Sequence, residues 1–339
     1  MNNFRKVFTY DKSINWFPGH MAKGLRLISE KLKNVQVIVE FEPIVQHKDR
    51  LIVYNKSDLA HPDTEAVITK AFKEYKNQDV VFTNATEDLN VRGIIKYLAS
   101  KARPTWTASG EEFATTVMVV GMPNVGKSSL INSLRRIGVR RGKAAPTGAI
   151  PGITRTVAGT IKVLDSPKVY LIDTPGVMIP HIADPVAAIK VALTGAISDH
   201  LSDEEVIVDY LLYRLNQEQD FGYVQMYNLQ EPTDDVREFL PQVAKYIGAL
   251  KKGGEYNLPL AAQFLLKQYR QGKLGRHTLD NLSPEFLEQF LTRSEDDDLV
   301  NQSRRQQKKA KKVEERRVRR FQQAQKQQRN ASGEQQRRV

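Results

Sequence analysis

The sequence contains a stretch, GMPNVGKS at residues 121–128, whose residue types and spacing could bind phosphate. It fits the template G-x-x-x-x-G-K-[ST], in which glycines let the backbone curl so that its N–H groups surround phosphate oxygens. Lys127 should reach the β- and γ-phosphates of a nucleotide, and Ser128 should ligate Mg²⁺. By itself the loop does not distinguish GTP from ATP. The nucleotide-binding residues predicted from it are Asn124, Val125, Gly126, Lys127, Ser128 and Ser129.

Two downstream segments could respond to the γ-phosphate. Asp173 begins the sequence DTPG directly after an apolar run, where a carboxylate can hold Mg²⁺ and the N–H of Gly176 can contact the γ-phosphate. Thr154 lies in PGITR, and a threonine on a mobile loop there can ligate Mg²⁺ only when the γ-phosphate is present. The alternative is an ordinary loop threonine. We expect Lys127, Thr154 and Gly176 to serve hydrolysis, and Ser128, Thr154 and Asp173 to hold Mg²⁺.

A base-reading motif, NKSD at residues 55–58, ends an apolar run nearer the N-terminus. Asp58 can accept hydrogen bonds from both N1–H and N2–H of guanine, and adenine offers no matching pair of donors. As a lone tetrapeptide NKSD is often just a turn, but together with the other motifs it predicts GTP. The predicted base-contacting residues are Asn55, Lys56, Asp58, Thr83 and Asn84, the last two at the end of the next apolar run.

The order of these motifs is unusual, because the base-reading motif precedes the phosphate loop. Ordinary GTPases have the reverse order, so the predicted domain is circularly permuted. Its sheet can still assemble, because a fold depends on which segments are adjacent in space. One consequence is that the DTPG motif leads directly into the C-terminal part of the chain, where nucleotide state could be transmitted.

Apolar runs alternate with helix-like segments through the first half of the chain. We predict strands at 35–39, 51–54, 79–82, 116–120, 157–164 and 168–172, and helices at 22–34, 63–76, 91–101 and 128–136. This alternation predicts an α/β fold with a mostly parallel sheet. Beyond residue 183 we predict helices at 184–194, 203–215, 233–250, 258–271 and 283–292.

The chain therefore divides into four predicted segments. An N-terminal segment, 1–34, carries the sequence WFPGHMAKG, and a circularly permuted GTPase domain spans 35–182. A smaller all-helical domain that binds RNA or the ribosome, 183–300, follows, and then a basic tail, 301–339. The tail has no clean apolar stripe, so we expect it to be disordered or a single helix.

Basic charge is concentrated in the tail. The net charge is +12, and residues 301–339 contain 14 Lys/Arg against 3 Asp/Glu, which leaves +1 for the first 300 residues. An acidic partner such as RNA is the natural inference, and a solvated tail is the alternative. The chain has no cysteine, which excludes disulfides and thiol catalysis and fits a reducing compartment. Without an apolar stretch of about 18 residues, we expect a soluble protein.

With its motifs in this order, the chain resembles the circularly permuted GTPases of ribosome biogenesis. The resemblance rests on WFPGHMAKG, the base motifs, GMPNVGKSSLINSL, PGITR and DTPGV. FGYV at 221–224 and DYLLY at 209–213 are most similar to the mitochondrial branch, whose members assist assembly of the large ribosomal subunit. The resemblance implies a GTPase that docks on rRNA of that subunit in the GTP state and leaves after hydrolysis.

The resemblance also implies roles for single residues. Val177 follows DTPG where Ras-type enzymes carry a water-orienting glutamine, so hydrolysis should be slow. Such members are often activated by K⁺, with Asn124 as its ligand. His20 matches a histidine proposed to assist hydrolysis, although a structural role in its loop fits the sequence equally well. The implied protein is a mitochondrial monomer, in the matrix or at the matrix face of the inner membrane, with the cytoplasm as the alternative.

One region departs from the family pattern. Members have a DAR-x-P stretch and a helical connection between the first strand and the base motif, whereas here only EFEPIVQHKDR separates two apolar runs. A parallel crossover needs about 10–12 residues including its helix. Either the sheet is trimmed there or the sequence is a shortened form.

Two other functions are consistent with parts of the sequence. A P-loop metabolic enzyme such as a nucleotide kinase would share the phosphate loop, but the paired NKSD and DTPG motifs argue against it. A GTP-binding, ribosome-associated scaffold or translation regulator with little or no turnover would share every motif, and the missing glutamine is compatible with it.

Overall fold

The computed structural model describes residues 4–11, 24, 27–28, 30–32, 35–40, 49–102, 106, 114–142, 145, 159–177, 182, 184–197 and 203–292. Residues 1–292 form one compact unit. The predicted site residues His20 and Thr154 lie outside the described residues, as does the basic tail 301–339. The predicted boundaries between domains stay a prediction.

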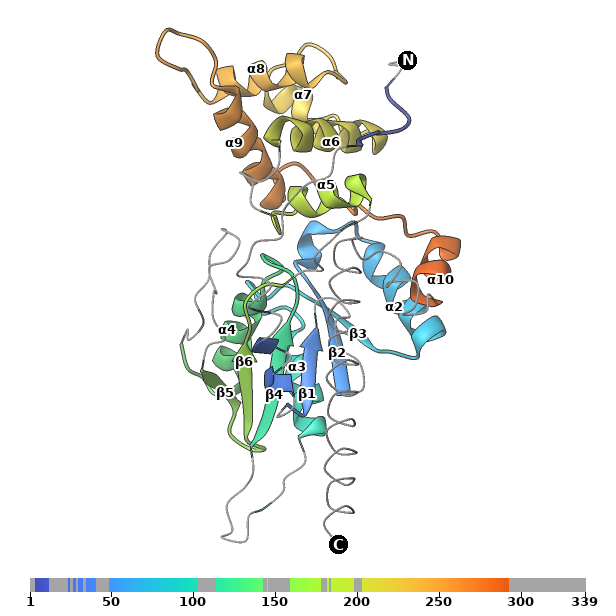
Figure 1. Ribbon diagram of the computed structural model, residues 1–339, viewed down its shortest axis with the longest axis vertical. Helices are drawn as coiled ribbons and strands as arrows, with labels where there is room; N and C mark the ends of the chain where they lie inside the picture. The colour runs from blue at the N-terminus through green and yellow to red at the C-terminus, as the bar shows by residue number, and fades with distance from the viewer. Residues whose placement is uncertain are drawn as a thin grey trace, which may run out of the picture. The chain divides into compact units, whose positions relative to one another are not determined.

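The strands form one six-stranded sheet in the order β3-β2-β1-β4-β6-β5, which can be followed across Figure 1. They are β1 Val37–Glu40, β2 Asp49–Asn55, β3 Val80–Thr83, β4 Thr115–Val120, β5 Thr160–Leu164 and β6 Val169–Asp173. Neighbouring strands are parallel except β5, which is antiparallel to β6. The predicted α/β class with a mostly parallel sheet is confirmed.

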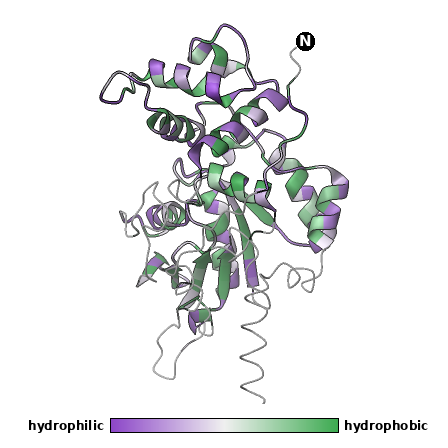
Figure 2. Ribbon diagram, turned by 45° about the horizontal axis from the view of Figure 1, so that its top comes forward, coloured by the Kyte–Doolittle hydropathy of each residue, from purple (hydrophilic) through white to green (hydrophobic). Residues whose placement is uncertain are grey.

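Side chains alternate between the two faces of this sheet, and apolar residues pack on both. On one face Val39 of β1 packs with residues of α3 (Val91–Lys101) and α4 (Lys127–Gly138), and on the other Ile38 packs with Ile28 and Val177. Burial of both faces explains why the central strands are nearly continuous apolar runs, which Figure 2 shows in green.

The link between β1 and β2 is the region that departs from the family pattern. The two strands are direct parallel neighbours, with Val37 opposite Asp49 and Glu40 opposite Ile52. Residues 41–48, which connect them, lie outside the described residues. Of the two alternatives for this link, a trimmed sheet is wrong, because both strands are present and paired.

Residues 184–292, hereafter the helical region, contain helices joined by loops. They are α5 Pro185–Leu193, α6 Glu204–Gln217, α7 Gly222–Met226, α8 Val236–Tyr246, α9 Leu258–Arg270 and α10 Pro284–Thr292. The predicted helix at 233–250 is too long: α8 starts after Asp235, whose side chain caps it, and stops before Gly248, which has a φ of +67°. The short α7 was not predicted. No helix in the described part of the chain is both long and apolar enough to cross a bilayer.

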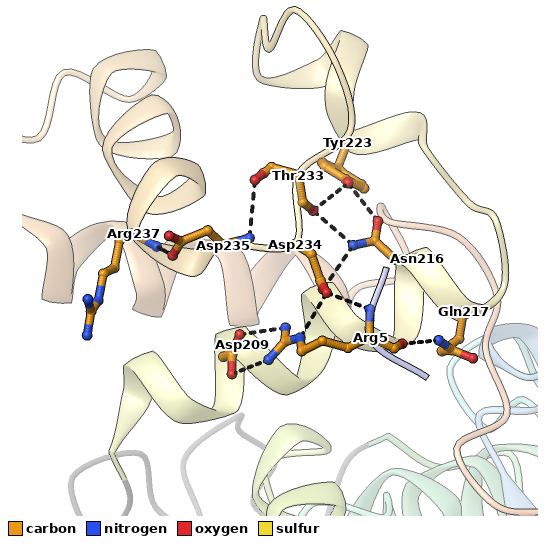
Figure 3. Close-up of polar contacts among 9 residues, drawn as sticks. All are labelled: Arg5, Asp209, Asn216, Gln217, Tyr223, Thr233, Asp234, Asp235 and Arg237. Carbon is orange, nitrogen blue, oxygen red and sulfur yellow. Dashed lines mark hydrogen bonds and ion pairs between the residues drawn. The ribbon is translucent and has the colours of Figure 1, made fainter. Parts of the chain in front are cut away.

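Two segments distant in sequence complete the packing. α10 buries Leu287 and Leu291 against Phe72 of α2 (Thr64–Lys76), a helix that follows the base motif. Residues 4–11 pack on the helical region, where the ring of Phe8 meets that of Tyr210 edge-on at 5.1 Å between centroids. Figure 3 shows Arg5 from this segment among polar residues of the helical region.

Candidate nucleotide site

The phosphate loop joins the C-terminal end of β4 to the N-terminus of α4, as the motif requires. Gly126 precedes α4 with a φ of +102°, and a Cβ atom there would lie 2.1 Å from Nδ2 of Asn55. Only glycine allows the base-reading strand to approach the loop so closely. Ser129 lies in the first turn of α4, whose free N–H groups and positive dipole end favour an anion such as phosphate.

Lys127 is buried beneath the loop, with 6% of its surface exposed. Its Nζ donates hydrogen bonds to the carbonyl oxygens of Gly121 at 3.0 Å and Met122 at 2.6 Å. Burial lowers the pKa of Lys127 to about 8, and the negative charge of Asp173 partly offsets this decrease. A poorly solvated cation gains strongly from an anion brought next to it, which suits the predicted phosphate contact.

Asp173 ends β6 beside the loop and is fully buried. The Ser128 hydroxyl donates to Oδ2 of Asp173 at 3.0 Å, whereas Oδ1 is buried without a hydrogen-bond partner among the described residues. Burial raises the pKa of Asp173, opposed by the Ser128 hydrogen bond and the charge of Lys127. A buried carboxylate oxygen that lacks a partner, next to a hydroxyl, is a donor set that Mg²⁺ fits. The structure thus brings together two of the predicted Mg²⁺ ligands.

The rest of DTPG lies against the phosphate loop. A Cβ atom on Gly176 would come within 2.7 Å of Cα of Pro123, and the N–H of Val177 donates to the carbonyl of Gly121 at 3.1 Å. Val177 is fully buried in the core, so it packs rather than facing solvent. Gly24, the last residue of WFPGHMAKG, lies beside it: a Cβ on Gly24 would be 3.1 Å from Cγ1 of Val177.

Asn55 links the base motif to two other loops. Its Nδ2 donates to the carbonyl of Val125 in the phosphate loop at 2.9 Å. Its Oδ1 accepts from the Thr83 hydroxyl at 3.1 Å and from the N–H of Ala85 at 3.0 Å. These contacts arise because β2 and β3 are parallel neighbours, with Asn55 opposite Thr83 at the same edge of the sheet. The predicted base and phosphate halves therefore form one site.

The other predicted base-contacting residues surround this edge. Lys56 has a left-handed backbone with a φ of +60°, and burial, assisted by the charge of Arg270, lowers its pKa. Asp58 is exposed, so its carboxylate can meet a ligand. Asn84 is buried and shapes its own turn, because its Oδ1 accepts from the N–H groups of Thr86 and Glu87. Asn84 therefore stabilises the turn that follows β3, and its predicted contact with the base stays a prediction.

Two contacts that the sequence does not reveal join these loops to the helical region. Nδ2 of Asn124, in the phosphate loop, donates to the carbonyl of Gly195 after α5 at 2.6 Å. The N–H of His277 donates to the carbonyl of Leu59, just past NKSD, at 3.1 Å. No local pattern in the sequence marks Gly195 or His277 as partners of a nucleotide loop. Gly195, two residues after the end of α5, has a φ of +81°.

Comparison with known proteins places this site in a family. A family model described as 50S ribosome-binding GTPase matches residues 116–244. Mitochondrial ribosome-associated GTPase 1 of Xenopus tropicalis is 38% identical over 304 residues, which cover 81% of this chain and 98% of the relative. The Mus musculus protein of the same name is 40% identical over 293 residues, which cover 78% of this chain and 89% of the relative. The chain belongs to the circularly permuted GTPases of ribosome biogenesis, in their mitochondrial branch.

Members of this family outside mitochondria are also similar. Ribosome biogenesis GTPase A of Bacillus cereus is 33% identical over 294 residues, covering 81% of this chain and 96% of the relative. The crystal structure of GNP-bound YlqF from T. maritima has a TM-score of 0.54 and 23% identity, covering 77% of this chain and 99% of that one. This likeness supports the circularly permuted fold. As a member of the family, the chain is a GTPase that binds GTP with Mg²⁺.

Proposed function

We propose that this GTPase assists assembly of the mitochondrial large ribosomal subunit, docking on its rRNA in the GTP state and leaving after hydrolysis. One observation carries the proposal: the phosphate loop, through Asn124, and the residue after the base motif, Leu59, are each hydrogen-bonded to the helical region. A change in either loop on hydrolysis would therefore act directly on the helices. The relatives named for the mitochondrial ribosome and for ribosome biogenesis support this choice of partner.

Within the site we assign each group one task. The backbone of the phosphate loop and Lys127 would hold the phosphates, and Ser128 and Asp173 would hold Mg²⁺. Asp58 would accept hydrogen bonds from N1–H and N2–H of guanine. Bound Mg²⁺ would neutralise phosphate charge that develops during hydrolysis. Thr154 and Gly176 would respond to the γ-phosphate, and His20 would assist hydrolysis.

A second cation belongs to the same proposal. We assign K⁺ to Asn124, whose Nδ2 donates a hydrogen bond to the carbonyl of Gly195 and whose side-chain oxygen would be the ligand. A K⁺ ion there would add positive charge beside the phosphates, where Val177 cannot orient water. Turnover stimulated by large subunits and measured in K⁺ against Na⁺ buffer tests this assignment; equal rates in the two buffers contradict it.

Basic surface supports rRNA as the partner. Residues 236–277, from α8 to just past α9, contain 8 Lys/Arg against 2 Asp/Glu, a balance of +6, and residues 301–339 add +11. At the turn between the two helices, Tyr246 and Tyr256 are 55% and 41% exposed, and Lys251 and Lys252 are exposed beside them. Lysines that contact phosphates and aromatic rings that stack on unpaired bases are the usual means of binding RNA loops.

The decisive experiment is sedimentation of the tagged protein with mitochondrial ribosomal subunits. We expect cofractionation with the large subunit in a non-hydrolysable GTP analogue and release in GDP. Asp58→Asn is the control, because it should weaken guanine binding and remove the difference between the two states. Equal cofractionation of the unaltered protein in both states, or cofractionation with the small subunit alone, contradicts the proposal.

The tail and the compartment are tested separately. We propose that the protein is a monomer in the mitochondrial matrix and that residues 301–339 add phosphate contacts. Deletion of this tail should lower rRNA affinity and flatten its dependence on salt, because fewer counterions are released. The same basic tail would be attracted to anionic lipid at the matrix face of the inner membrane. Salt extraction of mitochondrial membranes, followed by gel filtration, measures both the peripheral association and the oligomeric state.

A further inference from the structure

The segment that follows α9 lies along the loop that carries the base motif. The N–H of His277 donates to the carbonyl of Leu59 at 3.1 Å, and the N–H of His61 donates to the hydroxyl of Thr278 at 3.2 Å. The hydroxyls of Thr278 and Thr64 are 2.6 Å apart and share a hydrogen bond. Residues 59–64 are thus held at three successive points by residues 277–278, which are more than 200 positions away in the sequence.

This supporting segment is itself anchored to α6. Nη2 of Arg214 donates to the carbonyl of Thr278 at 2.9 Å and to the carboxylate of Glu218 at 2.6 Å. Nδ1 of His277 lies 2.6 Å from the other oxygen of Glu218, and the imidazole is 3% exposed. Because backbone and side chains are both fixed, the segment provides a rigid wall for the base loop.

Asp58 lies between this wall and a second anchor. On its N-terminal side, Asn55 is bonded to Thr83, Ala85 and Val125. On its C-terminal side, the bonds to residues 277–278 begin at Leu59, the next residue. Asp58 is exposed, so the position of its carboxylate depends on these two anchors. A bidentate contact to guanine requires both donors to be met at once, so small displacements weaken it.

We propose that Thr278 is a positioning residue for guanine selection: its hydroxyl and the adjacent N–H of His277 hold residues 59–64 so that the Asp58 carboxylate meets N1–H and N2–H of the base. This inference rests on the proposed role of Asp58. It gives the helical region a part in choosing the nucleotide. It also makes the coupling reciprocal, because a partner that shifts residues 277–278 must change guanine affinity by the same factor as guanine changes affinity for that partner.

The test compares GDP with inosine diphosphate, whose base lacks the exocyclic amine. In Thr278→Val the shape is kept and the hydroxyl is lost. We expect its Kd for GDP to rise about 3- to 10-fold, as for loss of one or two hydrogen bonds, and its Kd for inosine diphosphate, whose base keeps only the N1–H donor, to rise by a smaller factor. The ratio of the two dissociation constants, which measures the preference for GDP over inosine diphosphate, therefore falls. Thr278→Ser keeps the hydroxyl and should retain the preference of the unaltered protein.

Thr233→Val is the matched control. The Thr233 hydroxyl also makes two hydrogen bonds in the helical region, to the carboxylate of Glu238 and from the N–H of Asp235, at the start of α8. Its loss should leave both dissociation constants unchanged. Two results overturn the inference: an equal change for both nucleotides in Thr278→Val, or no change for either. If the unaltered protein does not prefer GDP over inosine diphosphate, the proposed role of Asp58 fails instead.

Discussion

The guanidinium group of Arg5 forms two hydrogen bonds with the carboxylate of Asp209 in α6, at 2.8 and 3.0 Å (Figure 3). The backbone N–H and Nε of the same arginine both donate to Oδ2 of Asp234, at 2.8 and 3.0 Å. These carboxylates, Asp209 foremost, raise the pKa of Arg5, so it is charged at any physiological pH. Residues 4–11 are therefore anchored to the helical region, although the whole sheet separates the two segments in the sequence.

We predict that Arg5→Ala lowers the free energy of unfolding by about 1–2 kcal/mol, because two carboxylates lose a shared partner that is itself about one-third exposed. Arg5→Lys should restore little of this stability, since an ammonium group cannot form the two parallel hydrogen bonds that the guanidinium makes with Asp209. Arg237→Ala, which removes an exposed arginine of the same region, is the control and should have almost no effect. Chemical denaturation of Arg5→Ala, Asp209→Ala and the double variant measures the coupling. Strict additivity would show that the pair contributes nothing.

Asn124 should serve two tasks that substitutions can separate. Asn124→Asp keeps side-chain oxygens that can bind K⁺. It loses the N–H group that donates to the carbonyl of Gly195, so the link to the helical region weakens. Asn124→Ala loses both. We expect Asn124→Asp to lose about 1 kcal/mol of stability in thermal unfolding, and Asn124→Ala about 2 kcal/mol, because alanine is also strained at the φ of +59° that Asn124 adopts. Only Asn124→Ala should lose the ratio of turnover in K⁺ to that in Na⁺. Loss of this ratio in Asn124→Asp as well would assign the K⁺ effect to the Gly195 contact.

The local parts of the site could be predicted from sequence. Gly126, Lys127 and Ser128 act within one loop, and Asn55 and Asp173 each end a strand, so their positions follow from the parallel sheet. The contacts of Arg5 with Asp209 and of Thr278 with Thr64 could not, because each depends on single polar residues far apart in the chain. Helix α7 was missed for another reason: five residues are too few to show a helical period.

The link between β1 and β2 shows how a length rule can mislead. The figure of about 10–12 residues includes a crossover helix. Residues 41–48 are eight, and an extended chain of that length can reach about 27 Å, roughly twice the length of a four-residue strand such as β1. The pairing of β1 with β2 and β4 is fixed by burial of Val37, Ile38 and Val39, which does not depend on a helix in the link.

Nucleotide affinity should depend on pH through Lys127. Its pKa of about 8 in the structure should rise when phosphate brings negative charge next to it, so binding takes up a proton above about pH 8. GDP affinity should then be nearly constant from pH 7 to 7.5 and fall towards pH 9, by at most about tenfold per pH unit. Calorimetry in two buffers of different ionisation enthalpy measures the proton directly. Asp58→Asn should bind more weakly with the same pH profile; no proton uptake at pH 8.5 would contradict the prediction.

Two glycines offer a matched test of how the helical region supports the base loop. Gly248 and Gly272 both follow a helix with positive φ, +67° and +74°, and the residue after each donates back to the helix, Ala249 to Ala244 and Lys273 to Gln268. A Cβ on Gly248 meets nothing within 4 Å, whereas one on Gly272 would lie 2.6 Å from Cδ2 of Leu59. Replacement by alanine should cost each variant about 1 kcal/mol of stability, from backbone strain alone.

Only Gly272→Ala should also raise the Kd for GDP, by about 2- to 5-fold, because the new methyl group displaces Leu59 next to Asp58. Denaturation and GDP titration of the two variants measure both quantities. An equal rise in the Kd for GDP in Gly248→Ala would show that general loosening of the helical region, not the contact with Leu59, controls the base loop.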